Sequence, residues 1–305
     1  MSVIYKQSEM LGFYIAGLFD LCFCRCNSKG KRGDGHIVMP TEVNKHNPRW
    51  HITFHIKNKP LAQKLLSKIG SGFIRYKIEN HACVITVSTV GGLKSIVHLT
   101  NGKLRTPKIS QMYLLIDWLN KHHQNQDLIK KLPLNTYPVT FAFVVAQAKA
   151  KGADPWLAGF IDADGSFDIR YTKKPPGLKR RVSCRFRLEQ RMSDPKTNHS
   201  YSGVLTLIAN YLCTRLNTRI QRSTGKTYYI IEVSSLAGIV ILTNYLNSYT
   251  LLTAKLLDFN DWCTVAQHMI NKTHYTENGL NEIAAIKDGL NTKRSQFQWD
   301  HLNHF

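Results

Sequence analysis

The stretch Trp156–Phe167, WLAGFIDADGSF, decides how the rest of this chain is interpreted. Asp154 and Pro155 precede it, and these residue types are favoured at the N-cap and at the first position of a helix. Gly165 is typical of a helix C-terminus. The stretch therefore predicts a short apolar helix that carries Asp164 at its C-terminal end. Because the helix dipole disfavours negative charge there, we expect a compensating cation or water network.

A second copy of this stretch stands earlier in the chain. Ile15–Phe23, IAGLFDLCF, aligns with Leu157–Gly165, LAGFIDADG, and keeps the Ala-Gly pair and the first Asp. In this alignment Cys22 replaces the second Asp. Small residues let two backbones approach closely. We therefore expect two helices to pack through the patches formed by Ala16 and Gly17 in the first copy and Ala158 and Gly159 in the second.

Further repeats follow each copy in the same order. Two strand-like stretches of the first half match stretches of the second: Ile52–Asn58 matches Leu188–Asp194, and Val84–Ser88 matches Ile230–Ser234. In each half a helical stretch and then a lysine follow, Lys108 in the first and Lys255 in the second. The chain is therefore interpreted as two copies of one module, with a first module at 1–120, a linker at 121–153 and a second module at 154–305. A length of 305 residues with 43% apolar residues is sufficient for two cores.

The linker contains an apolar run, Phe141–Ala146, within Val139–Ala150. This run is too short to span a bilayer, and we expect it to pack on one module. Met1–Glu9 is polar, which argues against an N-terminal signal peptide. No membrane partner is predicted.

The chain is strongly basic, because 41 Lys and Arg residues against 20 Asp and Glu residues give a formal net charge of +21. A surplus of this size favours a polyanionic partner. Many of the basic residues fall on one predicted hairpin of the second module: Arg170, Lys173, Lys174, Lys179, Arg180, Arg181, Arg185, Arg187 and Arg191. Arg181, Arg185, Arg187 and Arg191 stand at odd positions, so on a strand pair they point to the same face.

The first module carries a sparser set of basic residues, and one more follows in the second module: Arg25, Lys29, Lys31, Arg32, Arg49, Lys57, Arg75 and Lys77, then Arg222. A two-stranded ribbon fits the major groove of B-DNA, where Arg and Lys reach guanine edges and phosphates. We therefore expect a cationic sheet face that contacts nucleic acid. Sequence does not separate the side chains that read bases from those that hold phosphates.

The two motifs and the repeats around them resemble the double-motif LAGLIDADG homing endonucleases, the family of intron-encoded proteins that includes intron maturases. The resemblance runs from about Leu11 to about Lys293, and the tail from Lys255–Cys263 through Leu280–Ile283 is similar to the ending of fungal mitochondrial members. It implies an α+β fold of two pseudo-twofold-related modules, each an antiparallel saddle-shaped sheet with helices on one face. It also implies a monomer that binds a long double-stranded DNA target, and a mitochondrial origin with a plastid as the alternative.

The resemblance further implies an active site where the two motif helices end. Asp164 is the implied ligand of a catalytic Mg²⁺ ion, and Gln190 and Lys255 are its implied supporting residues. In the first module these places fall on Cys22, Phe54 and Lys108. A thiol is a poor ligand for magnesium, and a phenylalanine forms no hydrogen bond. Cleavage is therefore expected to be weakened to nicking of one strand, or lost. Asp20 lies roughly 200° around the helix from Cys22, so it does not simply replace the missing acid.

Two other functions fit the same residues. Loss of a catalytic acid with retention of a cationic sheet is what conversion to an RNA-binding intron maturase, or to a structural partner of organellar RNA, would leave. A DNA-binding repressor without cleavage is a third interpretation. A zinc site at Cys22, Cys24 and Cys26 lacks a fourth ligand at a familiar spacing, so the seven cysteines are interpreted as unpaired thiols.

Overall fold

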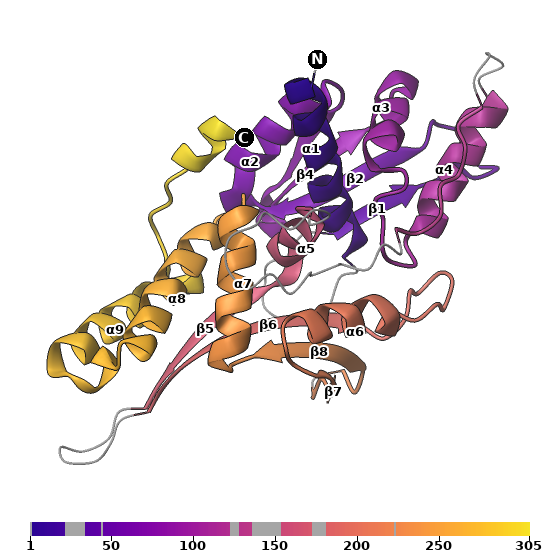
Figure 1. Cartoon of the computed structure of the whole chain (residues 1–305). Helices are drawn as coiled ribbons and strands as arrows, with labels where there is room; N and C mark the ends of the chain where they lie inside the picture. Colours follow the sequence, from indigo (N-terminus) through magenta and orange to yellow (C-terminus); the bar gives the residue numbers. More distant parts are fainter. Residues whose placement is uncertain are drawn as a thin grey trace.

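The computed structural model describes residues 2–21, 34–43, 45–122, 128–135, 154–172, 181–222 and 224–305. Within these ranges the chain forms two modules that repeat the same order of elements (Figure 1). This arrangement confirms the predicted α+β class with two related modules. Several residues singled out from the sequence lie outside the described ranges: Cys22, Cys24, Arg25, Cys26, Lys29, Lys31, Arg32, Lys173, Lys174, Lys179, Arg180 and the apolar run Phe141–Ala146.

The first module consists of one sheet and the helices that pack on it. Its elements are α1(Ser2–Asp20), β1(Asp34–Val38), β2(Arg49–His55), η1(Ile56–Asn58), α2(Lys59–Ile69), β3(Phe73–Lys77), η2(Ile78–Asn80), β4(Ala82–Val87), α3(Val90–Thr100) and α4(Ile109–His122).

The second module repeats this order and adds a helical C-terminal part. Its elements are α5(Trp156–Asp164), β5(Ser166–Tyr171), β6(Val182–Arg191), α6(Ser202–Tyr211), β7(Leu216–Ile220), β8(Thr227–Val233), α7(Leu236–Ser248), α8(Lys255–Ile270), η3(Thr273–Tyr275), α9(Glu277–Gly289), η4(Asn291–Lys293) and η5(Asp300–His304).

Each module contains a four-stranded antiparallel sheet, and the two sheets have matching strand orders, β1-β2-β4-β3 and β5-β6-β8-β7. Ile52 pairs with Ile85 in the first sheet, and Leu188 pairs with Ile231 in the second. These are the stretches that the sequence comparison had aligned. The register therefore agrees residue by residue with the predicted repeat.

Strand β6 shows how the sequence pattern orients a strand. Its even-numbered residues from Val182 to Gln190 are buried, whereas Ser183, Arg187, Glu189 and Arg191 on the other face are partly exposed. Because successive side chains of a strand point to opposite faces, the apolar set packs under the helices. The odd-numbered arginines share the opposite, open face of the sheet.

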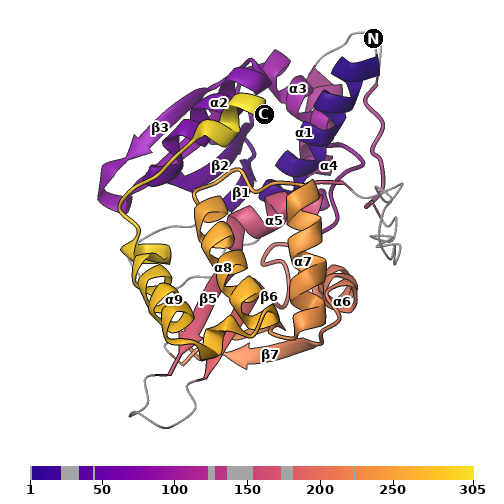
Figure 2. The ribbon, with the colours of Figure 1, turned by 60° about the vertical axis from the view of Figure 1, so that its left-hand side comes forward.

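Helices α1 and α5 lie side by side between the two sheets (Figures 1 and 2). Neither Gly17 nor Gly159 has room for a side chain. A β-carbon on Gly17 would overlap the carbonyl oxygen of Trp156, and one on Gly159 would overlap the carbonyl oxygen of Tyr14. The two backbones therefore touch directly, as the Ala-Gly patches predicted.

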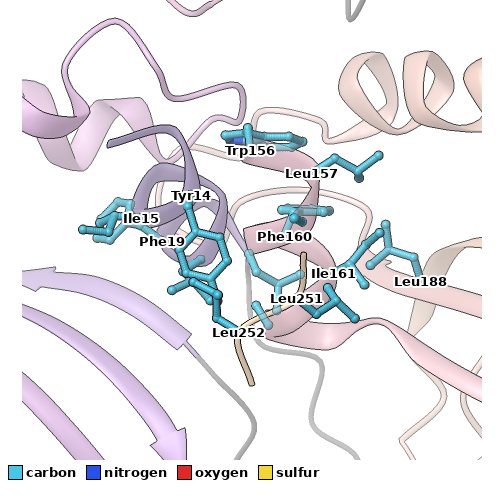
Figure 3. Packing of buried hydrophobic residues seen from close by; sticks show 14 of the residues in the cluster. Tyr14, Ile15, Phe19, Trp156, Leu157, Phe160, Ile161, Leu188, Leu251 and Leu252 are labelled. Atoms are coloured by element: carbon cyan, nitrogen blue, oxygen red, sulfur yellow. The ribbon is translucent and has the colours of Figure 1, made fainter. Parts of the chain in front are cut away.

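The core is continuous across this helix pair. Tyr14, Ile15 and Phe19 of α1 belong to the same buried cluster as Trp156 and Phe160 of α5 (Figure 3). The C-terminal segment returns to the first module beside α2 (Figure 2). There the ring of Phe305 meets that of Tyr14 with centroids 6.0 Å apart, and the ammonium group of Lys57 lies 5.4 Å from the ring centroid of Phe297.

Two details of α5 differ from the prediction. The helix begins at Trp156 with Pro155 in the N-cap position, while Asp154 Oδ1 accepts a hydrogen bond of 2.9 Å from the Trp156 amide. Gly165 does end the helix, but its backbone is extended rather than left-handed. The glycine is required by space instead, because a β-carbon there would lie 2.6 Å from Ile161 Cγ2.

Part of the predicted linker packs on the first module. The Asn101 side chain forms two hydrogen bonds with the backbone of residues 130–132. Its Nδ2 donates to the Lys130 carbonyl at 2.8 Å, and its Oδ1 accepts from the Leu132 amide at 3.2 Å. Within the ranges that the structure describes, no helix is both long and apolar enough to cross a membrane.

Candidate active site

The first aspartate of the α1 motif is buried in a set of hydrogen bonds. Asp20 Oδ1 accepts from Thr106 Oγ1 at 2.7 Å, and Asp20 Oδ2 accepts from the Arg105 amide at 2.7 Å. Trp156 Nε1, from the other motif helix, donates to Asp20 Oδ2 at 2.9 Å. Burial raises the pKa of Asp20 to about 6 even though these donors act to lower it. The Asp20 carboxylate therefore links its own module to the second motif helix through hydrogen bonds.

Asp162 has the same surroundings in the second module. Thr253 Oγ1 donates to its Oδ1 at 2.5 Å, and the Leu252 amide donates to its Oδ2 at 2.6 Å. Tyr14 Oη, from α1, donates to the same Oδ2 at 2.7 Å. Burial raises the pKa of Asp162 as well. The first aspartate of each motif therefore accepts one hydrogen bond from the opposite motif helix and the others from a loop of its own module: two for Asp20, and three for Asp162, to which the Thr253 amide also donates at 3.3 Å.

The two matched lysines lie at the C-terminal ends of the motif helices. Lys108 is 2% exposed, and its Nζ donates to the carbonyl oxygens of Phe19 at 3.0 Å, Gly35 at 2.5 Å and Leu21. Lys255 Nζ donates to the carbonyl oxygens of Ile161 at 2.9 Å and Asp162 at 2.8 Å. A positive charge is favoured at the last carbonyls of a helix. In this structure the lysines cap the motif helices, and Lys255 places a positive charge on the last turn of α5.

Asp164 is the last residue of α5 and is 7% exposed. Its counterpart in the ungapped motif alignment, Cys22, lies outside the described residues. Among the residues that are described, no three His, Cys, Asp or Glu side chains gather into a preformed metal cluster.

Gln190 and Phe54 occupy the same place in the two sheets. Gln190 pairs with Tyr229 and Phe54 with Cys83, four residues along each strand from the matched pairs Phe186–Val233 and Trp50–Val87. Gln190 Oε1 accepts from the Arg191 amide at 2.8 Å. Its buried Nε2 has no hydrogen-bond partner in the described part of the chain, so it has a donor to spare. Phe54 offers none.

The open face of the second sheet carries predicted arginines, and carboxylates hold two of them, Arg185 and Arg187, closely. Arg185 Nη2 lies 2.5 Å from Asp168 Oδ2, and Arg187 Nε lies 2.8 Å from Glu232 Oε2. Arg185 also reaches Glu232, at 3.3 Å. This face is therefore a network of mixed charge with a positive excess, rather than a purely cationic surface.

The remaining basic residues of this module are more exposed. Arg170 is 3.8 Å from Asp168, and Arg219, which the sequence analysis did not single out, pairs with Glu189 at 2.9 Å. Arg191 is partly exposed at the end of β6, and Arg181 and Arg222 are exposed beside the strands.

The open face of the first sheet centres on histidines. The rings of His36 and His51 lie 4.9 Å apart, and His51 Nδ1 is 3.0 Å from Thr86 Oγ1. Burial, together with the nearby charges of His36, Arg75, Arg49 and Lys77, lowers the pKa of His51 to about 4. Three of the predicted basic residues, Arg49, Arg75 and Lys77, thus act electrostatically on one point of this face. Lys57 instead lies over Phe297 of the C-terminal segment.

Sequence reasoning missed several residues that build the site. The loops that hold the two first aspartates read Thr106-Pro107-Lys108 and Thr253-Ala254-Lys255. This Thr-x-Lys repeat is a usable sequence signal, of which the prediction above uses only the lysine. The cross-helix donors Tyr14 and Trp156 and the acids Asp168 and Glu232 left no comparable local pattern.

Comparison with known proteins places this geometry in a family. A LAGLIDADG endonuclease model matches residues 157–266. The probable intron-encoded DNA endonuclease aI1 of Mycosarcoma maydis is 40% identical to 34% of this chain, and the match covers 84% of that protein. The chain belongs to the LAGLIDADG endonuclease family.

Other relatives of this LAGLIDADG protein match along nearly its whole length. The intron-encoded DNA endonuclease aI3 of Saccharomyces cerevisiae is 26% identical over 97% of this chain and 73% of its own. The cox1 intron-2 37.2 kDa protein of Schizosaccharomyces pombe is 24% identical over 91% of this chain and 72% of its own.

A solved structure shares the fold. The meganuclease I-SmaMI bound to DNA superimposes with a TM-score of 0.64 and 22% identity, covering 93% of this chain and 99% of that one.

Proposed function

We propose that this LAGLIDADG protein is a site-specific, intron-homing DNA endonuclease that cuts double-stranded DNA with the help of a divalent metal ion, Mg²⁺. The proposal rests on one observation. At Gly17 and Gly159 the backbones of α1 and α5 touch between two sheets whose open faces carry basic residues. In this proposal Asp164, the last residue of α5, is the carboxylate that binds the metal ion between the two surfaces that would hold the target.

DNA is the ligand that the sheet faces support. A two-stranded ribbon enters the wide major groove of B-DNA, whereas the major groove of A-form RNA is too deep and narrow for side chains to read. The relatives named as intron-encoded DNA endonucleases support the same choice. Binding of the host intron RNA without cleavage of DNA would instead indicate an RNA-binding maturase.

The residues of the second module fit a magnesium ion in part. Asp164 offers a hard carboxylate oxygen, and magnesium prefers such ligands and keeps several waters. When bound, the ion would lower the pKa of a water molecule and neutralise charge on the phosphate. Lys255 would hold the last turn of α5, and therefore Asp164, in place through its bonds to Ile161 O and Asp162 O. The spare Nε2 donor of Gln190 would orient water.

Hydrolysis joins a water oxygen to phosphorus and breaks one phosphorus–oxygen bond of the backbone. The proton released by the water ends on the leaving deoxyribose oxygen. Cutting both strands requires this chemistry twice, so it needs a second acid in the first module. The number of strands that are cut depends on which residue faces Asp164.

The experiment is cleavage of the uninterrupted allele of the host gene by the purified full chain with Mg²⁺. We expect cleavage at one site, and we expect Asp164→Asn to reduce its rate by at least about 100-fold. Asp288→Asn is the matched control, because Asp288 is an exposed residue of α9 whose ion pair with Lys293 lies on the surface. The proposal fails if the wild-type chain binds the host intron RNA and leaves the DNA target uncut.

We also propose that the protein acts in mitochondria as a monomer. The likeness to a cox1 intron protein supports the mitochondrion. The pseudo-twofold repeat supports a monomer, because one chain already supplies both modules. Fractionation of organelles followed by light scattering on the purified protein tests both statements.

A further inference from the structure

The strand register gives the first motif a different ending from the one that the ungapped alignment gave. His51 and Arg187 are equivalent, since they pair with Thr86 and Glu232 at the same distance from the ends of β4 and β8. Across the first two strands of each sheet, His51 pairs with His36, and Arg187 pairs with Ser166. His36 is therefore the structural counterpart of Ser166. Counting back along the chain, Asp34-Gly35 takes the place of Asp164-Gly165.

The two glycines confirm this equivalence independently. A β-carbon on Gly165 would lie 2.8 Å from the carbonyl oxygen of Ile161, and one on Gly35 would lie 2.8 Å from the carbonyl oxygen of Phe19. Phe19 and Ile161 occupy the same position in the two motifs. Each glycine thus fits against the same residue of its own motif helix.

The hydrogen bonds of the two capping lysines support the same equivalence. Lys108 and Lys255 bind the carbonyl oxygens of Phe19 and Ile161, respectively. Lys108 also binds the carbonyl oxygen of Gly35 at 2.5 Å. The backbone of Gly35 therefore lies at the end of α1, although many residues separate the two in sequence. Ile37 and Phe167, two residues after each glycine, are both buried in the core.

We propose that Asp34, and not Cys22, is the catalytic acid of the first module. The first motif then consists of Ile15–Leu21 followed by Asp34-Gly35, interrupted by the twelve residues 22–33. The inference rests on the proposed endonuclease function, because it supplies the second metal-binding carboxylate which that function needs. Both halves of the active site carry an aspartate, and the chain cuts both strands.

One consequence is that Cys22 belongs to the inserted segment and has no part in the chemistry. The two halves remain unequal at their supporting positions, because Phe54 stands where the second module has Gln190. We therefore expect the two strands to be cut at different rates rather than one strand to stay intact.

The first test needs neither DNA nor metal. Deleting residues 22–33 joins Leu21 to Asp34 and gives Asp20-Leu21-Asp34-Gly35, which matches Asp162-Ala163-Asp164-Gly165 in spacing. If the register argument holds, this variant folds with a thermal unfolding midpoint equal to or above that of the wild type, since the deletion only shortens a connection. Failure of the variant to fold overturns the inference.

The second test uses activity with a matched control. On a supercoiled plasmid that carries the target site, the wild type should produce linear DNA. Asp34→Asn should lose linearisation by at least about 100-fold while keeping its DNA affinity, and Cys22→Ser should cut as the wild type does. Loss of linearisation in Cys22→Ser with normal cutting by Asp34→Asn overturns the inference. A wild type that does not cut at all counts against the proposed function instead, and the deletion test still decides the register.

The third test measures the metal itself. Mn²⁺ is titrated into the protein, and the free ion is counted by its EPR signal. Asp34→Asn and Asp164→Asn should weaken Mn²⁺ binding to a similar degree, whereas Cys22→Ser should leave it unchanged. Weakening by Cys22→Ser and not by Asp34→Asn contradicts the assignment.

Discussion

The hydroxyl group of Tyr14 donates a hydrogen bond of 2.7 Å to Asp162 Oδ2 across the contact between the two modules. The indole nitrogen of Trp156 returns a bond of 2.9 Å to Asp20 Oδ2 in the opposite direction. The first aspartate of each motif therefore has a structural role at the interface between the modules, and not a catalytic one. Burial of both carboxylates within these bonds makes the interface sensitive to substitutions that only remove a hydroxyl group or add a methyl group.

Gly159→Ala should separate the motif helices. The added methyl group would overlap the carbonyl oxygen of Tyr14 on the facing backbone, and main-chain atoms cannot rotate away. We expect a loss of roughly 3 kcal/mol in the free energy of unfolding, measured by urea denaturation. The control is Gly203→Ala in α6, where no atom stands within 4 Å. Equal stability of the two variants would contradict direct backbone contact.

Thr253→Val should destabilise the second module. It removes the 2.5 Å bond to Asp162 Oδ1 and leaves a buried carboxylate oxygen without that donor. The expected cost is about 1–3 kcal/mol, and Thr106→Val should cost a similar amount because Thr106 bonds to Asp20 in the same way. Thr264→Val on α8, whose hydroxyl bonds to the exposed helix carbonyl of Asn260, is the control and should change stability little.

Asp20→Asn should alter how stability depends on pH. Burial raises the pKa of Asp20 to about 6, above its ordinary value of 3.8. The protonated carboxyl is thus favoured in the folded state, so this contribution is complete below about pH 4 and is lost as pH rises through about 6. Relative to Asp20→Asn, the wild type should gain up to about 3 kcal/mol on going from pH 7 to pH 4. Parallel curves from urea denaturation across this range would refute the burial effect.

His51→Gln should have the opposite effect in the first module. Burial and the neighbouring charges lower the pKa of His51 to about 4. Protonation is therefore disfavoured in the folded state, and stability present above about pH 6.5 is lost as pH falls toward 4. The variant should lose less stability than the wild type over this interval. NMR titration of the His51 ring, with an apparent pKa near 6.5, would show the prediction to be wrong.

Glu232→Gln should change DNA binding more than folding. Glu232 holds both Arg185 and Arg187, so its neutralisation frees positive charge on the open sheet face. We expect higher affinity at low salt and a steeper dependence on salt, by about one unit of slope, measured by fluorescence anisotropy. Glu282→Gln on α9, which pairs with His268 away from this face, should leave the slope unchanged.

Much of the fold followed from residues that recur without gaps. The Ala-Gly patches at Gly17 and Gly159 and the matched strands around Ile85 and Ile231 each recur without an internal gap, so a simple comparison of the two halves predicts them. The same ungapped stretches carry the resemblance to the family and its α+β fold, and both predictions are confirmed. Tyr14, Trp156 and Thr253 escaped notice because their partners are distant in sequence, and a single residue at each end forms no pattern.

The site was harder to predict where the repeat is interrupted. An ungapped comparison of nine residues puts Cys22 opposite Asp164, although Gly33-Asp34-Gly35 stands only a short way along the chain. The pairing of His36 with His51 is needed to bring Asp34 back into alignment. Likewise, counting charges on the arginine-rich hairpin predicted a cationic face. Only the cross-strand register shows that Asp168 and Glu232 lie among those arginines.

The direct contact of backbones at Gly17 and Gly159 also limits how this protein could be re-engineered. Main-chain atoms fix the separation of the two motif helices at this point, so no side chain between them can act as an adjustable spacer. Substitutions on the strands can change the surface that each sheet offers, but the distance between the two surfaces stays constant. A chimera that exchanges one half for that of a relative should therefore work when the donor half brings the same glycine at the junction.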